Sequence, residues 1–342
     1  MTPVVHAVCA ARFLLPSAGH LALMRAALAC APRCTVAVRR AFLAPSPANP
    51  HPWEQRVRWL QAALTADERA RVAIVPLREH WDDERLVRQL QAAVAATAGD
   101  RVAWITDAPP VDAQDLPAGW SFSAAPAGDP DAALVPWLHA LYEADDPAPL
   151  LATPPSALPP AAVDDLRTWI AQPAFATVRD DWRQIAHERR QWSVAPYPVV
   201  LATVDAVVQA GGHVLLIRRG RSPGKGLWAL PGGFLETTED MLHAALRELV
   251  EETGLPVPPR TMRQALRGRR VFDHPERSQR GRIITQSFHF DLGEIAPPPV
   301  HGADDAAAAQ WLPIEALHAL ETQLHDDHFH MLDVFLGLTR DP

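Results

Sequence analysis

Short apolar runs alternate with amphipathic stretches over residues 1–110. Four of the apolar runs are rich in β-branched residues and predict buried strands, at Val4–Val8, Thr35–Val38, Val72–Pro76 and Val102–Ile105. The amphipathic stretches between them predict helices, at Leu21–Ala31, Trp53–Leu64 and Glu84–Ala95. Strands that alternate with helices favour the α/β class, in which a parallel sheet carries helices on its faces.

The pattern changes twice beyond this region. From Ala108 to Pro160 the chain is dominated by Pro, Ala and Asp, with one helical stretch at Leu134–Tyr142, and the six prolines of Pro147–Pro160 predict no regular element there. A helical stretch at Val163–Trp192 follows. Strands are then predicted at Val199–Val208, His213–Arg218, Thr285–Asp291 and Gln310–Pro313, and a last helix at 327–338. We therefore expect domains at 1–145 and 196–342, joined by a Pro-rich linker and connecting helix at 146–195.

Composition narrows the class of protein. Hydrophobic residues make up 48% and charged residues 21%, as in globular proteins. No stretch approaches 18 uninterrupted apolar residues and no basic segment precedes the apolar N-terminus, so we expect neither a membrane span nor a signal peptide. The net charge of -8 argues against nucleic-acid binding by phosphate neutralisation. The three cysteines are too few for a disulfide framework and fit a reducing cytoplasm.

Residues 232–255 contain the best-defined helix of the chain. Thr237 or Thr238 is expected to cap its N-terminus, and the acidic residues at the next two positions suit the positive end of the helix dipole. Apolar residues at spacings i, i+3, i+4 and i+7 predict a core-facing stripe, formed by Leu242, Ala245, Leu246 and Leu249. Gly254 is expected to end the helix.

A second face of this helix gathers Glu248, Glu251 and Glu252. At such spacings each like-charge pair costs roughly 0.2–0.5 kcal/mol in an isolated helix. A divalent cation would offset this cost, because Mg²⁺ prefers carboxylate oxygens at about 2.0–2.1 Å together with water and phosphate oxygens. Arg247 is placed to orient one carboxylate or to meet a phosphate. Three glutamates alone fit a solvated acidic face equally well.

The whole segment decides between these interpretations. It fits the pattern G-x5-E-x7-R-E-U-x-E-E-x-G-U, where U is bulky and aliphatic, at Gly233, Glu239, Arg247, Glu248, Leu249, Glu251, Glu252, Gly254 and Leu255. The segment thus resembles the Nudix box. The resemblance implies a Nudix α/β/α sandwich that hydrolyses a nucleoside diphosphate linked to another moiety, a small molecule. It also implies Mg²⁺ as cofactor, with Mn²⁺ as an alternative, held by Glu248, Glu251, Glu252 and the backbone carbonyl of Gly233. The resemblance leaves open which carboxylate serves as general base.

Eight arginines follow between Arg260 and Arg282. Guanidinium groups pair with phosphate and stack on bases, although the same composition fits a solvated loop. Residues 271–285 and 321–329 resemble ADP-ribose pyrophosphatases that are fused to nicotinamide mononucleotide adenylyltransferases. This resemblance implies ADP-ribose as substrate, split to AMP and ribose 5-phosphate. The substrate contacts that it implies are Phe272, Arg277, Arg280 and Arg282, whereas a structural role is favoured for Asp304, Asp305 and His328.

The N-terminal part resembles the nucleotidyltransferase domain of these fusions, with departures. The family's first loop reads G-R-F-x-P-x-H-x-G-H, and Arg12, Gly19 and His20 match it. Ala11 replaces its leading glycine and Ser17 replaces its first histidine. The loop is therefore interpreted as a degenerate nucleotide site on a Rossmann-like, nucleotidyltransferase-type parallel sheet.

Two further signatures of that family are missing. Residues 133–141 stand where I-S-x-T-x-I-R is expected and contain neither the hydroxyls nor the arginine, and residues 107–112 replace the K-D-S-S stretch. A triphosphate would thus lose most of its electrostatic partners. We expect the N-terminal domain to be impaired or inactive in adenylyl transfer.

Several functions are compatible with these observations. The leading hypothesis is a cytoplasmic, homodimeric ADP-ribose pyrophosphatase that binds neither nucleic acid nor membrane. Within the same chemistry, NADH or a dinucleoside polyphosphate is an alternative substrate, and a bifunctional enzyme with both sites active is disfavoured by the missing motifs. A non-hydrolytic regulator that senses ADP-ribose is the alternative from another class. The intact glutamates and the acidic net charge count against it.

Overall fold

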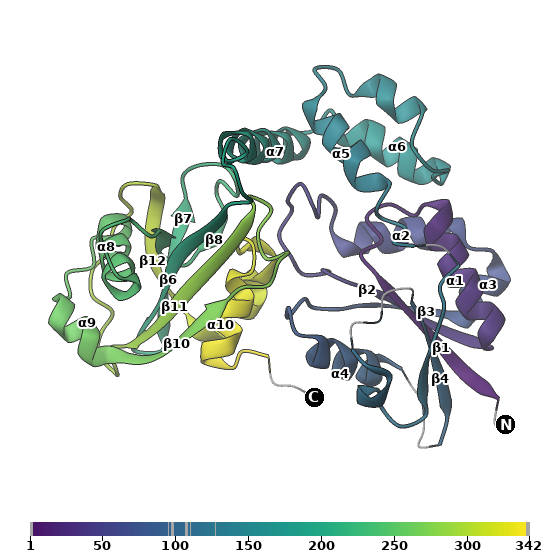
Figure 1. The fold of residues 1–342 in the computed structure, drawn as a ribbon, viewed down its shortest axis with the longest axis horizontal. Coiled ribbons are helices and arrows are strands. Elements are labelled where there is room, and N and C mark those ends of the chain that lie inside the picture. The colour runs from purple at the N-terminus through teal and green to yellow at the C-terminus, as the bar shows by residue number, and fades with distance from the viewer. Residues whose placement is uncertain are drawn as a thin grey trace. The chain divides into compact units, whose positions relative to one another are not determined.

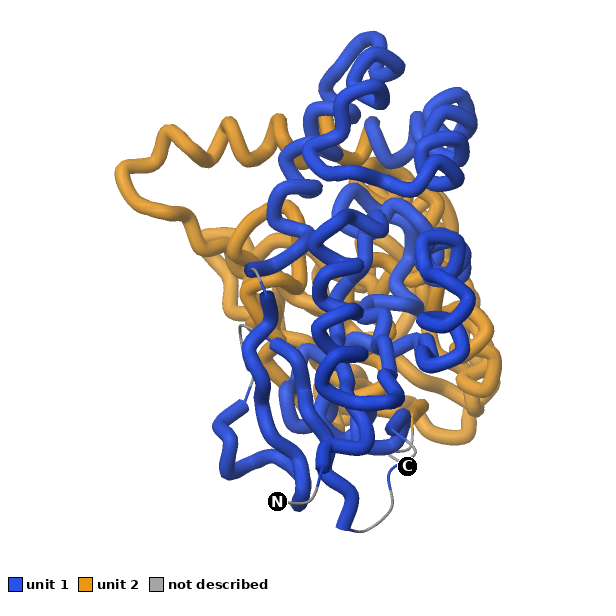
Figure 2. The backbone as a smooth tube through the Cα atoms, turned by 90° about the vertical axis from the view of Figure 1, so that its right-hand side faces the viewer, with its two compact units in different colours: residues 1–179, 342 blue, residues 180–341 orange. Residues whose placement is uncertain are grey.

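The structure is a computed structural model that describes residues 3–94, 96, 99–106, 109, 111–126 and 128–339. Contacts between residues divide the chain after Arg179 into an N-terminal and a C-terminal unit, which Figure 2 distinguishes by colour. Ala95, at the end of a predicted helix, and Asp107, Ala108 and Pro110 lie outside the described residues. None of the described helices combines the length and the apolarity that a bilayer span requires.

A five-stranded sheet forms the centre of the N-terminal unit (Figure 1). Its strand order is β3-β2-β1-β4-β5, and every neighbouring pair is parallel. The strands are β1 (Val4–Ala11), β2 (Arg33–Val38), β3 (Val72–Pro76), β4 (Arg101–Ile105) and β5 (Trp120–Ser123). The first four confirm the predicted strands, and the parallel order confirms the α/β class. Strand β5 is not among the predicted ones because its four residues lie within the Pro- and Ala-rich stretch.

Helices cover both faces of this sheet (Figure 1). They are α1 (Ala18–Cys30), α2 (Trp53–Ala63), α3 (Ala66–Arg71) and α4 (Asp83–Ala93). A 3₁₀ turn at Ala113–Asp115 and α5 (Leu134–Glu143) follow later in the chain, and α5 lies beside α6 (Pro160–Trp169) rather than on the sheet (Figure 1). On one face Met24 of α1 and Leu60 of α2 pack with Val36. On the other face Leu90 of α4 packs with Val8. Because burying one such side chain contributes about 1.5–3 kcal/mol, these two cores fix the helix layers.

Two predictions for the stretch of sequence between β5 and the first strand of the second sheet are wrong. The stretch Val163–Trp192 forms two helices, α6 (Pro160–Trp169) and α7 (Pro173–Trp192). Pro173 has no N–H group to continue α6, and it begins α7 instead. The Pro-rich run contains a 3₁₀ turn at Ala148–Ala152, because a proline in a first turn gives up an N–H that has no intrahelical partner. Residues 180–192 of α7 belong to the C-terminal unit.

A seven-stranded mixed sheet forms the centre of the C-terminal unit. Its main order is β10-β11-β6-β7-β12, with β8 paired to β7 and β9 paired to β6. The strands are β6 (Val200–Ala210), β7 (His213–Arg219), β8 (Trp228–Ala229), β9 (Gly232–Phe234), β10 (Leu266–Phe272), β11 (Arg282–Asp291) and β12 (Ala306–Pro313). Strands β6 and β11 are parallel, and the other pairs of this sheet are antiparallel.

Helices lie on both faces of this second sheet (Figure 1). One face carries α8 (Met241–Thr253) and α9 (Pro259–Ala265), and the other carries a 3₁₀ helix (Ile314–Gln323) and α10 (His328–Leu336). Leu246 and Leu249 of α8 pack with Val204 of β6, whereas Leu332 of α10 packs with Val207 from the opposite side of the same strand. This layering confirms the expected α/β/α sandwich.

Helix α8 begins later than its sequence predicts. Asp240 is the cap, and its carboxylate accepts a hydrogen bond of 2.9 Å from the backbone N–H of His243. The predicted caps Thr237 and Thr238 are wrong, because both lie in the turn that precedes Asp240. Gly254 ends the helix as predicted, since its φ of +58° is a left-handed conformation that glycine adopts without strain.

Candidate active site

A cavity of about 290 Å³ lies in the C-terminal unit, beside the strand and loop that lead into α8. Its walls combine β6, the loop after β7, β9, α8, the segment after β10, α7 and the segment before α10. They include Asp205, Gly233, Phe234, Glu252, Arg277, Arg280 and His328. Of the residues that the sequence singles out as metal or substrate contacts, Gly233, Glu252, Arg277 and Arg280 thus line one cavity.

Arg247 connects the acidic residues around α8. Its Nη1 donates to Glu248 Oε1 at 3.0 Å and to Glu251 Oε2 at 2.9 Å. Its Nε and Nη2 donate to the two carboxylate oxygens of Glu239 at 3.1 and 2.7 Å. The hydrogen bonds to Glu239, and then those to the other two glutamates, raise the pKa of Arg247 above its usual value. One guanidinium therefore offsets the like-charge repulsion expected on this helix face.

Glu252 is the most buried of the three helix glutamates, with 5% of its surface exposed. Its Oε2 accepts a hydrogen bond of 2.9 Å from the backbone N–H of Gly232. Burial raises the pKa of Glu252 to about 8, and the charge of Glu248 acts in the same direction. A carboxylate in such surroundings is stabilised by a positive partner.

The backbone of β9 passes directly beside Glu248. A Cβ added at Gly233 would lie 2.3 Å from Glu248 Oε1, so glycine is what permits this approach. The Gly233 carbonyl and the three glutamates are hard oxygen donors, which suit a divalent cation in chemistry. In this structure two of them, Glu248 and Glu251, bind the Arg247 guanidinium. Within the part of the chain that the structure describes, no three His, Cys, Asp or Glu side chains are grouped to hold a metal ion.

Two of the predicted substrate residues are buried. Arg277, which is 7% exposed, donates from Nε and Nη2 to both carboxylate oxygens of Asp327 at 2.8 Å each. Phe272 packs against Phe335, with ring centroids 6.2 Å apart, in the core beneath α10. Phe272 ends β10 with its ring turned into this core, and it is not part of the cavity lining. Its placement thus differs from the predicted substrate contact.

Arg280 and Arg282 lie on either side of Gly281 but have different surroundings. Arg280 donates from Nε to Glu188 Oε2 of α7 at 2.7 Å. Its guanidinium carbon lies 4.8 Å from the ring centroid of Phe234. Arg282 donates to the backbone carbonyl of Asp273 and does not line the cavity.

Sequence reasoning misses Asp205, which lines the cavity from β6. Its Oδ2 accepts a hydrogen bond of 2.6 Å from Thr285 Oγ1, and burial raises the pKa of Asp205 to about 6. His328 also lines the cavity, and its Nδ1 accepts the backbone N–H of Leu230 at 2.8 Å, which places the ring proton on Nε2. Asp305, also in the lining, pairs with Arg221 at 2.7 Å. An acidic residue inside an otherwise apolar strand is the signal that marks Asp205.

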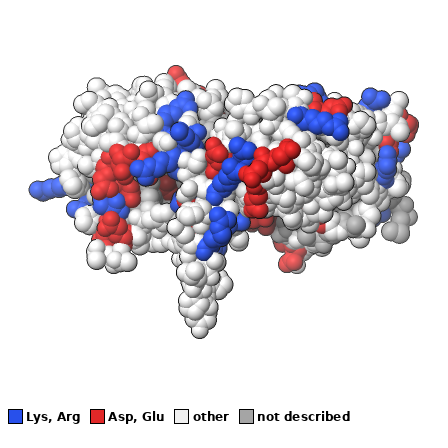
Figure 3. Space-filling view, turned by 90° about the horizontal axis from the view of Figure 1, so that it is seen from above, with Lys and Arg blue, Asp and Glu red and all other residues white. Residues whose placement is uncertain are grey.

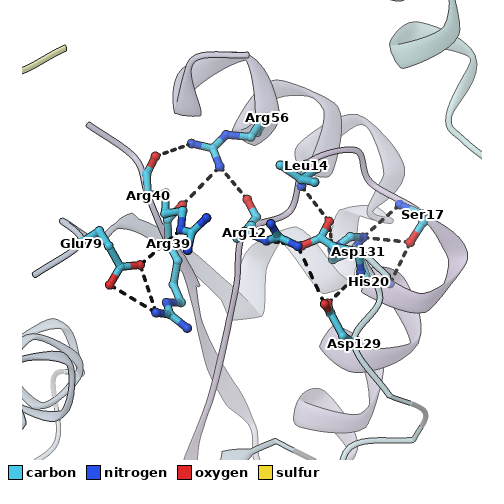
Figure 4. Close-up of polar contacts among 10 residues, drawn as sticks. All are labelled: Arg12, Leu14, Ser17, His20, Arg39, Arg40, Arg56, Glu79, Asp129 and Asp131. Carbon is cyan, nitrogen blue, oxygen red and sulfur yellow. Dashed lines mark hydrogen bonds and ion pairs between the residues drawn. The ribbon is translucent and has the colours of Figure 1, made fainter. Parts of the chain in front are cut away.

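The degenerate loop of the N-terminal unit is closed by internal contacts (Figure 4). Ser17 caps α1, where its Oγ accepts the backbone N–H of His20 at 3.4 Å and lies 2.8 Å from His20 Nδ1. The His20 side chain is fully buried. A Cβ at Gly19 would lie 3.1 Å from Pro130 Cβ, so the chain before α5 packs closely on this loop.

Asp131 lies among the basic groups of that loop (Figure 4). Its Oδ1 accepts the backbone N–H of Leu14 at 3.1 Å and lies 3.3 Å from His20 Nε2, and its Oδ2 lies 3.7 Å from Arg12 Nε. Burial alone would raise the pKa of Asp131, but His20, Arg12 and the Leu14 amide outweigh it and hold the pKa below its usual value. An internal carboxylate therefore meets the groups that the resemblance assigns to a phosphate.

Arg56 stabilises the same edge of the sheet (Figure 4). Its Nη1 donates to the carbonyl oxygens of Arg12 and Arg39 at 2.6 and 3.2 Å, and its Nη2 donates to that of Arg40 at 3.1 Å. Burial lowers the pKa of Arg56 to about 10. Its role is to tie together the chain segments that follow β1 and β2.

Comparisons with known proteins agree with the geometry of the C-terminal unit. The sequence model of the family described as "NUDIX domain" matches residues 200–335. The chain is 37% identical over 119 residues to the ADP-ribose pyrophosphatase of Methanocaldococcus jannaschii, a match that covers 34% of this chain and 64% of that protein, slightly less than two thirds of its length. It is 32% identical over 115 residues to the phosphatase NudJ of Escherichia coli K12, covering 34% of this chain and 69% of NudJ.

The whole chain resembles a solved structure. That structure is a bifunctional NMN adenylyltransferase/ADP ribose pyrophosphatase from Francisella tularensis, with a TM-score of 0.85 and 25% sequence identity over 98% of this chain and 99% of that one. The likeness confirms the two-part fold that the sequence predicts. The NUDIX match and the extent of the NudJ alignment show the family: the chain belongs to the Nudix family, and the family's domain lies in its C-terminal unit.

Proposed function

We propose that the C-terminal unit hydrolyses the pyrophosphate of ADP-ribose to AMP and ribose 5-phosphate, with Mg²⁺ as cofactor and Mn²⁺ as an alternative. The observation that carries this proposal is the pairing of Glu248 and Glu251 with Arg247 on α8, beside the Gly233 backbone and an arginine-lined cavity that Glu252 also lines. The names of the archaeal relative and of the Francisella structure support ADP-ribose as the substrate.

The proposal gives each group a role. Glu248, Glu251, Glu252 and the Gly233 carbonyl would hold the metal ion. The chemistry supplied by such an ion would be neutralisation of the pyrophosphate charge and a lowered pKa for a water molecule. Arg247 keeps the carboxylates turned toward one point, because its guanidinium contacts two of the three.

The N-terminal unit is inactive in adenylyl transfer under this proposal. The Asp131 carboxylate already lies beside Arg12 and His20, so a triphosphate there would meet a negative charge and compete for these groups. The protein acts in the cytoplasm as a homodimer on a nucleoside diphosphate-linked small molecule. On the face drawn in Figure 3, acidic and basic side chains are interspersed, which fits a small anionic ligand better than a nucleic-acid backbone.

Product analysis of purified protein with Mg²⁺ tests the proposal. ADP-ribose should give AMP and ribose 5-phosphate, and NADH and diadenosine polyphosphates serve as competing substrates. The control is Glu252→Gln, whose amide oxygen still accepts the Gly232 N–H and so preserves the fold. The loss of its charge should lower hydrolysis by about two to three orders of magnitude. A folded and fully active variant would contradict the metal assignment.

The same assay separates the remaining functions. Cleavage of NADH or of a diadenosine polyphosphate in preference to ADP-ribose would keep the chemistry and replace the substrate. Tight binding of ADP-ribose without cleavage would indicate a sensor. Formation of NAD from ATP and nicotinamide mononucleotide at an enzymatic rate would contradict the inactive N-terminal unit.

A further inference from the structure

The C-terminal half of helix α7 lines the cavity, although it precedes the residues that match the NUDIX domain. The match begins at residue 200, whereas Gln184 and Glu188 of α7 line the cavity together with Gly233 and Glu252. Residues 180–192 belong to the same compact unit as these groups. A helix outside the family domain therefore completes the wall of the candidate active site.

Glu188 is fixed on both of its carboxylate oxygens. Oε1 accepts a hydrogen bond of 2.9 Å from Gln184 Nε2, one helical turn earlier. Oε2 accepts a bond of 2.7 Å from Nε of Arg280. The two charged side chains are 12% and 22% exposed, so water screens this ion pair less than a surface pair. The helix thereby sets the position of the Arg280 guanidinium.

Arg280 is left with its two terminal nitrogens available. Its guanidinium carbon lies 4.8 Å from the ring centroid of Phe234, the residue after Gly233. Within the described part of the chain, Nη1 and Nη2 of Arg280 have no hydrogen-bond partner. A guanidinium held at Nε and packed on a ring presents a planar pair of donors, which matches the oxygens of a phosphate.

We propose that Glu188 is a positioning residue that holds Arg280 over Phe234, so that the terminal nitrogens of Arg280 bind the phosphates of a nucleoside diphosphate-linked substrate. This inference rests on the proposed function of the same cavity. Under this proposal α7 contributes to substrate affinity, whereas the groups on α8 act in the reaction step.

A purely structural ion pair between α7 and the segment after β10 is the competing explanation. Other contacts hold the two together without Glu188. Arg189 donates to the backbone carbonyl of Gln279, and a Cβ at Gly281 would lie 3.4 Å from the ring of Trp192. Removing the Glu188 carboxylate should therefore release Arg280 while α7 stays in place.

Steady-state kinetics on the full chain with ADP-ribose and Mg²⁺ test this proposal. Glu188→Ala should raise KM about tenfold and leave kcat within about twofold, because a charge-assisted contact is lost away from the reacting atoms. Glu188→Gln keeps an oxygen that can accept from Arg280 and should raise KM less. The matched control is Asp180→Ala, which removes an exposed carboxylate from the same helix and should change neither constant.

Arg280→Ala and the double variant complete the test. If Glu188 acts through Arg280, Arg280→Ala should raise KM at least as much, and Glu188→Ala should add nothing in the Arg280→Ala background. An unchanged KM in Glu188→Ala, a fall in kcat without a rise in KM, or additive losses in the double variant would overturn the proposal.

Calorimetric titration of ADP-ribose in EDTA distinguishes this inference from the proposed function. If the wild-type protein does not hydrolyse ADP-ribose in the presence of Mg²⁺ but binds it in EDTA, and Glu188→Ala weakens that binding about tenfold, the inference stands and the hydrolytic function fails. If hydrolysis is found and Glu188→Ala changes neither KM nor Kd, the function stands and the inference fails. A wild-type protein that binds neither ADP-ribose, AMP nor NADH would overturn both.

Discussion

Replacement of Arg277 by alanine should destabilise the C-terminal unit more than replacement of its direct partner, Asp327, by asparagine. Arg277 donates to both carboxylate oxygens of Asp327, and the side chains of both residues are almost fully buried. The positive charge of Arg277 also lowers the pKa of Asp205 and of Asp326, whereas burial raises the pKa of both. One guanidinium therefore serves three carboxylates, of which Asp205 and Asp327 are buried and Asp326 is partly buried.

The expected loss of folding free energy follows from the number of carboxylates that share this one cation. Removing one partner of a buried ion pair costs about 3–5 kcal/mol, because the other charge stays buried without compensation. Arg277→Ala should fall in this range, since three carboxylates lose their shared cation. Asp327→Asn should cost about 1–3 kcal/mol, because Arg277 keeps the charges of Asp205 and Asp326 and an oxygen at position 327.

Urea-dependent amide hydrogen exchange on the full chain measures these free energies within one unit. Peptides from β6 and β11 report the C-terminal unit, and peptides from β1 and β2 should be unchanged and serve as an internal control. A loss of less than 1 kcal/mol in Arg277→Ala would refute the reasoning. So would an Asp327→Asn variant that is as unstable as Arg277→Ala, because the shared-cation argument requires the asymmetry.

Two predictions concern the N-terminal unit. Asp131→Ala should raise the affinity of the loop before α1 for ATP about tenfold or more, because Arg12 and His20 lose their internal anion. Hydrogen exchange checks this, since ATP should protect the amide hydrogens of α1 in the variant. Equal protection by ATP in the wild-type protein would contradict the prediction. His51 is buried between Trp59 and Trp169, and burial lowers its pKa to about 3. The unfolded chain binds the proton below pH 6.5, so stability is lost as pH falls, by about 2 kcal/mol between pH 6.5 and pH 5. Urea unfolding should show this loss, and His51→Phe should abolish it; a variant with the same pH dependence would contradict the assignment.

Local sequence signals were enough for most of the secondary structure. Strands β1 to β4 are runs of β-branched residues, and α8 carries its apolar stripe and its terminal Gly254 within one segment. The start of α8 was harder, because Thr237, Thr238 and Asp240 are all good caps, and the choice depends on the path of the chain after β9. Strand β5 is only four residues long and lies in a Pro- and Ala-rich stretch, so its pairing with the parallel strand β4 could not be predicted locally.

From local pattern alone, the candidate site could be predicted only where its residues share one helix, whereas Gly233, Arg277 and Arg280 of the cavity wall followed from the family resemblance. Glu248, Glu251 and Glu252 follow from the spacing of the segment. Asp131 and His20 lie far apart in the sequence of the N-terminal unit, and the residues around each of them give no local signal that predicts their contact. The pairing of Arg280 with Glu188 likewise depends on how α7 returns to the C-terminal sheet. Such partners are chosen by packing rather than by local pattern.

The position of α7 has a practical consequence for anyone who wishes to divide this protein. A fragment that begins at Val200, where the family match starts, would retain all the glutamates of α8. It would lack Gln184 and Glu188, and with them the anchor of Arg280. It would also lack Asp181, whose Oδ2 accepts the backbone N–H of Gly224 at 3.0 Å at the rim of the same cavity. The residues that match the family and the residues that form the candidate site therefore begin at different points of the chain. An excised domain should begin no later than Asp180.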